Sequence, residues 1–156
     1  MMKVLRIDHI AMAVTDLKAA EENFEKRLGA EKMLSVKRED TQYTVSYMKW
    51  GESCLTLVQP DKPTCFIQKD IDKKGEGLHH MGIEVENLAE AEAHFIAAGG
   101  KVGPKETIPG VRSEFVVAPK NNNGLLLQVI EFFGPYKDVA APVRYSMLAK
   151  DGHLQH

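Results

Sequence analysis

The sequence predicts an α+β fold built from two tandem βαβββ modules, and an internal repeat is the main reason. The stretch from Gly77 to Val85 repeats an earlier one when the chain is shifted by 71 positions, so that His9 falls on His80. Two copies are too few for a solenoid, which favours a pair of similar modules packed together. Strand-like and helix-like patterns also follow each other in the same order in both halves. Other matched pairs are Val14 and Val85, Leu17 and Leu88, Phe24 and Phe95, and Gly29 and Gly100.

The first module is expected over residues 4–60. Residues 4–14 alternate as a strand does, which puts His9 on one face together with Ala11 and Ala13. Asp16 is a suitable N-cap for the helix that follows, and Gly29 a suitable C-terminal glycine. The remaining strands are predicted over residues 33–37, 43–50 and 54–58.

The second module is expected over residues 77–133, after a connector at 61–76. Its first strand is predicted over residues 78–85, and Asn87 with Glu90 forms a capping box for the helix. Short strands are predicted near 101–102, 114–118 and 125–132. Residues 1–133 are therefore predicted to form one domain. Residues 134–156 are predicted to be a C-terminal surface extension in which 143–148 docks and the last residues are loose.

Composition restricts the class of protein further. A formal charge of −2 gives no electrostatic reason to expect nucleic acid or an anionic membrane as a partner. No apolar run approaches the roughly 20 residues that span a bilayer. Cys54 and Cys65 have no metal-type spacing and form no disulfide framework, which favours a reducing cytoplasm.

Each module carries a histidine on its first strand and an uncharged polar residue on its last. These are His9 and His80, and, at an offset of 72, Thr56 and Gln128. A lone histidine in an apolar strand is usually a satisfied core residue, but a pair at equivalent positions favours a shared metal site. Gln128 could instead form a hydrogen bond with a neighbouring strand or a buried water. Thr56 is better explained by the high strand propensity of threonine, or as a residue behind the ligands.

The chain resembles the vicinal oxygen chelate superfamily, which contains glyoxalase I, extradiol dioxygenases and antibiotic-resistance binding proteins. Within it, the likeness is greatest to the methylmalonyl-CoA epimerases. The resemblance covers about residues 5–133. Its most specific segments are 8–14 (DHIAMAV), 75–81 (GEGLHHM) and 119–128, from Pro-Lys through GLLLQ.

This resemblance implies a cup-shaped mixed sheet around one divalent metal ion, such as Zn, Co, Ni or Mn. His9 and His80 match the two histidine ligands of the family. Gln128 stands where the family has a glutamate ligand, and Thr56 where it has Glu or Gln. Because both positions are neutral here, we expect weaker metal binding than in carboxylate-bearing relatives, with Gln128 offering a carbonyl oxygen.

The resemblance also implies that the metal polarises a carbonyl while a carboxylate moves the α-proton. Glu39 and Asp40 lie near the family's catalytic glutamate, although the usual Gln-Gly-Val continuation is missing, and both could equally be a charged loop. Glu84 is the third candidate base, because strand alternation puts it on the face of His80; a solvated rim position is the alternative. His79 is expected to point to the opposite side of the strand.

Two function classes remain open. One is an enzyme, either an epimerase-like isomerase or lyase or a glyoxalase-like member with another substrate. The other is a small-molecule binding protein that has lost the chemistry. A dioxygenase is disfavoured because the matched positions provide no carboxylate ligand. An acyl-CoA substrate is implied by resemblance alone, and a homodimer stays open.

Overall fold

A computed structural model describes residues 1–154 of the chain. The first module consists of β1 (Val4–Ala13), α1 (Leu17–Leu28), β2 (Glu31–Arg38), β3 (Tyr43–Trp50) and β4 (Ser53–Pro60). The second consists of β5 (Gly77–Val85), α3 (Leu88–Ala97), β6 (Lys105–Ile108), β7 (Arg112–Val117) and β8 (Leu127–Phe132). The remaining helices are α2 (Phe66–Lys74), α4 (Ala141–Lys150) and two 3-10 turns at Pro119–Asn121 and Gly134–Tyr136.

All eight strands form one mixed sheet in the order β2-β3-β4-β1-β5-β8-β7-β6. In each module the first strand pairs parallel with the last, as β1 with β4 and β5 with β8. The two modules join through the antiparallel pairing of β1 with β5. The predicted α+β class and the two-module mixed sheet are therefore confirmed.

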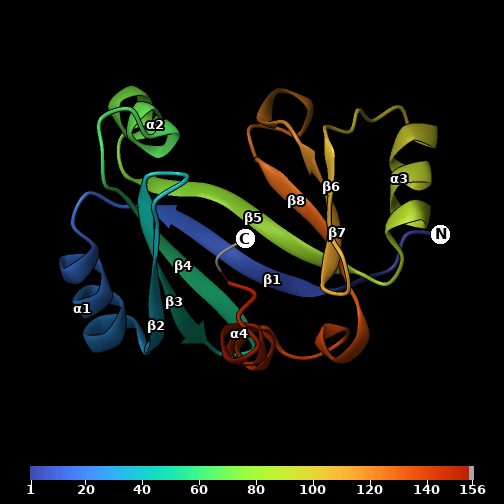
Figure 1. Ribbon diagram of the computed structural model, residues 1–156. Helices are drawn as coiled ribbons and strands as arrows, with labels where there is room; N and C mark the ends of the chain where they lie inside the picture. Colours follow the sequence, from blue (N-terminus) through green and yellow to red (C-terminus); the bar gives the residue numbers. More distant parts are fainter. Residues whose placement is uncertain (155–156) are drawn as a thin grey trace.

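Helices α1 and α3 lie at opposite ends of the molecule and cover the outer face of the sheet (Figure 1). Both begin at the predicted caps, since Asp16 accepts a hydrogen bond from the amide of Ala19 and Asn87 one from the amide of Glu90. Gly29 ends α1 in the left-handed region, at φ 74°. Each helix buries its apolar stripe on its own module, which leaves the inner face of the sheet free for other contacts.

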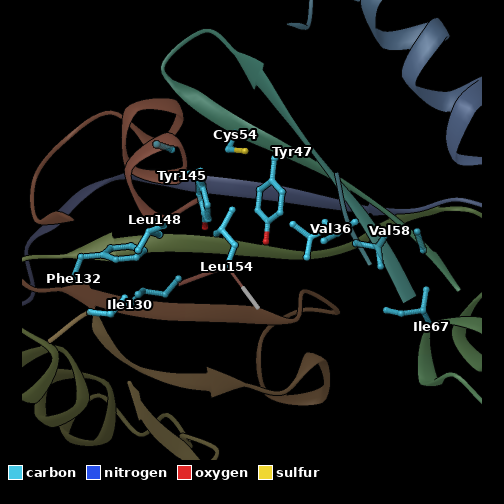
Figure 2. Close-up of a cluster of buried hydrophobic side chains, with 14 of the residues drawn as sticks. Val36, Tyr47, Cys54, Val58, Ile67, Ile130, Phe132, Tyr145, Leu148 and Leu154 are labelled. Carbon is cyan, nitrogen blue, oxygen red and sulfur yellow. The ribbon is translucent and has the colours of Figure 1, made fainter. Parts of the chain in front are cut away.

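Helix α4 packs against the inner face of the sheet, so the C-terminal segment is more than the surface extension that was predicted. Tyr145 and Leu148 of α4, and Leu154 beyond it, are buried beside Tyr47 and Phe132 (Figure 2). The predicted docking segment 143–148 lies within this helix, although Val143 itself is exposed. The prediction that the last residues are loose falls on 155–156, which lie outside the described part of the chain.

Strand β6 begins at Lys105, later than the predicted strand near residues 101–102. The amide of Gly103 already bonds the carbonyl of Val116 at 2.6 Å, and Pro104 has no amide to donate, so regular pairing starts only after the proline. Within residues 1–154, no helix combines the length and the apolar character needed to cross a membrane.

Candidate metal and substrate site

The two histidines of the repeat meet where the modules join. Their Nε2 atoms are 3.2 Å apart, and the rings stand edge to face at 84°. His9 comes from β1 and His80 from β5, so each module supplies one imidazole. Strand pairing holds both backbones, and the site therefore depends on the interface between the two modules.

A glycine makes room for the His9 ring. Gly82 pairs with His9 across the β1–β5 ladder, and a Cβ atom on Gly82 would lie 2.3 Å from Cε1 of that ring. No side chain fits at this distance without moving the imidazole. Gly82 therefore sets the position of His9 directly.

Asp8 and Tyr145 fix the proton of His9. The Nδ1 atom of His9 lies 2.7 Å from Oδ2 of Asp8, and the hydroxyl of Tyr145 donates to the same oxygen at 2.5 Å. Burial alone raises the pKa of Asp8, but the hydrogen bonds from His9 and Tyr145 and the charge of Arg144 hold it below its usual value. Because an ionised Asp8 accepts the Nδ1 proton, Nε2 of His9 presents its lone pair.

A second chain of contacts fixes the proton of His80. Nε2 of His79 lies 2.8 Å from Oδ2 of Asp70, and Nδ1 of His79 lies 2.8 Å from Nδ1 of His80. A neutral His79 that donates to Asp70 must accept at Nδ1. His80 then donates from Nδ1, and its Nε2 also presents a lone pair.

The predicted orientation of His79 is wrong, because a bulge interrupts the alternation of β5. Ala11 pairs with His80 but Met12 pairs with Leu78, which leaves His79 as an extra residue. Both histidines consequently line the same cavity.

Two lone pairs that face each other at 3.2 Å repel unless a cation lies between them. Burial, followed by the neighbouring His9 and His79, lowers the pKa of His80 to about 3, so the His80 imidazole is neutral near pH 7. Neutral imidazole is a suitable ligand for a metal cation, and the two facing Nε2 atoms fit such a role.

Gln128 adds an oxygen to the same cavity. Its Oε1 is buried and has no hydrogen-bond partner among the described residues, so it is available to a cation or a substrate. Thr56 also lines the cavity and is 6% exposed. Residues 1–154 contain no group of three or more His, Cys, Asp or Glu side chains arranged to hold a metal. The residues fit a cation bound by two imidazoles and an amide oxygen, without a carboxylate.

The cavity has a volume of about 290 Å³, at the lower end of the range for small-molecule sites. Arginines from both modules, Arg38 and Arg112, line it together with Glu114. Tyr47 and Tyr145 contribute rings 5.0 Å apart. Burial raises the pKa of both hydroxyls, so they stay neutral near pH 7.

None of the three predicted bases lines this cavity. Glu84 is fully buried, but its carboxylate is held by Arg6, by Arg144 and by the amide of Asp138. Glu39 and Asp40 lie on the exposed turn after β2, where they pair with Lys37 and Arg38.

Several residues of the cavity were missed by the sequence analysis. Tyr145 comes from the tail, where no periodic pattern indicated an inward face. Glu114 left a weak signal, since it is a charged residue at the start of the predicted strand 114–118. Arg38 is the last residue of β2 and Arg112 the first of β7, and the sequence alone does not show which face of these strands lines a cavity.

The sequence was compared with models of known families. Residues 8–117 match the model described as the glyoxalase/bleomycin resistance protein/dioxygenase superfamily, which covers more than half of the chain. The chain belongs to this superfamily. The predicted resemblance is thereby confirmed.

Curated relatives point to one group of enzymes. The ethylmalonyl-CoA/methylmalonyl-CoA epimerase of Cereibacter sphaeroides is 30% identical over 128 residues, which cover 80% of this chain and 96% of the relative. The mitochondrial methylmalonyl-CoA epimerase of Homo sapiens is 33% identical over 130 residues, covering 80% and 72%. Among solved structures, the methylmalonyl-CoA epimerase of Mycobacterium tuberculosis matches with a TM-score of 0.71 at 21% identity, covering 85% of this chain and 90% of that one. This structural match shows the shared fold.

Proposed function

We propose that this protein is a metal-dependent enzyme of the methylmalonyl-CoA epimerase type, which polarises the carbonyl of a small acyl thioester for α-proton transfer. The observation that carries the proposal is the convergence of two Nε2 lone pairs at 3.2 Å beside the unpaired Oε1 of Gln128. Relatives named as acyl-CoA epimerases supply the substrate class.

His9, His80 and Gln128 are the proposed ligands. A bound divalent cation supplies Lewis acidity toward a substrate carbonyl. Asp8 and Tyr145 orient His9, and Asp70 orients His80 through His79. Hydrogen bonds to the second ring nitrogen commonly orient metal-ligating imidazoles in this way. Thr56 lines the same cavity from β4, and we assign it a supporting role rather than that of a ligand.

The cavity walls support placing the reacting acyl group between them. Val45, Val58, Ile130 and Phe132 give apolar walls that exclude water, while Arg38 and Arg112 offer positive charge to an acidic substrate. A volume of about 290 Å³ suits the acyl part of a thioester. We place the protein in a reducing compartment such as the cytoplasm, because Cys54 and Cys65 are both free thiols.

A binding protein without catalysis is the second candidate. The neutral ligand set favours it, because amide and imidazole ligands leave the charge of a divalent cation uncompensated. A glyoxalase-like reaction on another substrate remains the enzymatic alternative. The two classes differ in whether a carbon–hydrogen bond is broken.

The deciding experiment combines metal analysis with proton exchange. Purified protein is loaded with zinc or cobalt, and methylmalonyl-CoA is incubated with it in D2O while the α-proton signal is followed by NMR. We expect deuterium incorporation that the metal-free protein and the His9→Ala and His80→Ala variants lack. Metal-loaded protein that binds the thioester without exchange overturns the epimerase proposal in favour of the binding protein.

A further inference from the structure

Glu114 is the only carboxylate on the cavity wall within the described part of the chain. It lies on β7 and is 8% exposed. Strand alternation sends Phe115 and Val117 outward into the cluster under α3, which leaves Glu114 and Val116 facing the cavity. A charged side chain in such a place needs a structural or chemical reason.

The carboxylate of Glu114 makes few contacts that would stabilise the fold. Its Oε2 atom is buried without a hydrogen-bond partner among residues 1–154. The nearest cation is Arg112, whose Nε lies 3.4 Å away as an ion pair without hydrogen-bond geometry. The carboxylate is therefore balanced in charge by Arg112, while its Oε2 atom accepts no hydrogen bond from residues 1–154.

Other buried or nearby carboxylates are already committed to partners. Glu84 is bound by Arg6, Arg144 and a backbone amide. Asp8 accepts from His9, Tyr145 and Arg144. Asp70 accepts from His79. None of these three lines the cavity, so none can reach a substrate there.

Strand register places Glu114 next to the proposed ligands. Gln128 pairs with Val116, and Ile130 pairs with Glu114, so Glu114 is a diagonal neighbour of Gln128 on the same face. Diagonal neighbours are about 7–8 Å apart, within reach of long side chains. The α-carbon of a thioester is two bonds from its carbonyl oxygen, so an oxygen held near Gln128 brings the α-proton toward Glu114.

We propose that Glu114 is the base that takes the α-proton of the substrate, an inference that rests on the proposed function. The α-carbon–hydrogen bond breaks, and its electron pair moves toward the carbonyl to give an enolate with the negative charge on oxygen. The proton forms a bond to a carboxylate oxygen of Glu114. The carboxyl group of Glu114 exchanges this proton with solvent and returns a proton to carbon, which restores the carboxylate and the thioester with water as the only other participant.

The test compares wild type with Glu114→Gln and Glu114→Asp, each loaded with cobalt, by deuterium incorporation into methylmalonyl-CoA in D2O. Glu106→Gln is the matched control, because Glu106 pairs with Glu114 across the β6–β7 ladder but is exposed and does not line the cavity. Cobalt affinity, methylmalonyl-CoA affinity and thermal unfolding are measured on every variant.

We expect Glu114→Gln to lose about 100-fold or more in exchange rate, the usual contribution of a general base, while cobalt and thioester affinities stay within threefold. Glu114→Asp should recover part of the rate, and Glu106→Gln should match wild type. Wild-type exchange that survives in Glu114→Gln overturns the role of Glu114 alone. Loss in Glu114→Gln with equal loss in Glu114→Asp and weakened thioester binding shows a structural role instead, and absent exchange in wild type overturns the proposed function itself.

Discussion

At the scale of single residues, Gln128 limits how tightly the site holds a cation. Replacing it with Glu adds a negative ligand beside two neutral imidazoles, so Gln128→Glu should tighten zinc or cobalt binding by about tenfold or more, an effect of about 1.4 kcal/mol. Metal titration with a competing chelator measures this. Asn121→Asp makes the same change on an exposed 3-10 turn and should leave the affinity unaltered. Equal or weaker binding by Gln128→Glu shows that residue 128 does not face the ion.

Gly82 is a second residue whose identity the site requires. Gly82→Ala should cost about 1–3 kcal/mol in unfolding free energy, because the new Cβ lies 2.3 Å from the ring of His9. It should also weaken metal binding by displacing that ring. Urea denaturation measures the first effect and metal titration the second.

A double-mutant cycle with His9→Ala identifies the cause of this loss. If the clash is with the imidazole, Gly82→Ala should be nearly neutral in the His9→Ala background. A penalty of equal size in both backgrounds means that the backbone of β5, and not the ring, resists the alanine.

The sequence could predict the histidine pair but not the whole site. Equivalence under the repeat was enough to bring His9 and His80 together, because strand pairing follows from the modules. The position of His79 depends on a bulge that only the β1–β5 register reveals. Glu114 could not be distinguished from a solvated charge, since burial of β7 depends on how the sheet curls.

At the scale of elements, α4 is held by an arginine that reaches both modules. Arg144 is fully buried, binds Asp8 of β1 and Glu84 of β5, and lies 3.9 Å above the ring of Phe132. Sequence patterns missed this helix, because its buried residues include a charge and so give no apolar stripe. Caps at Asp16 and Asn87, in contrast, are local signals, and both helices began where they indicated.

Arg144→Met tests the importance of this contact. It removes the cation that the two buried carboxylates share, so that Asp8 loses its arginine partner and Glu84 is left with Arg6, and we expect a loss of about 3–5 kcal/mol in unfolding free energy. Lys150→Met, at the exposed end of the same helix, is the control and should change stability by less than about 0.5 kcal/mol. Urea unfolding compares the two, and a loss below 1 kcal/mol for Arg144→Met contradicts the assignment.

At the scale of the molecule, the two modules share one sheet and should unfold together. The β1–β5 ladder and the bridge through Arg144 join them, so neither module has a complete core alone. Trp50 is the only tryptophan and reports on the first module, while far-UV circular dichroism reports on both. We expect coincident urea transitions from the two probes; a fluorescence transition that precedes the other shows independent modules.

The contact of Arg144 with Asp8 also sets an order of events during synthesis. The ribosome synthesises β1 and β5 well before residues 141–150. Asp8 and Glu84 therefore lack Arg144 while most of the chain has already emerged. The carboxylate that orients His9 acquires its buried partner only when the last helix leaves the exit tunnel. Assembly of the proposed site therefore follows the synthesis of α4, and a chain stopped before Arg144 carries every proposed ligand but lacks the contact with Asp8.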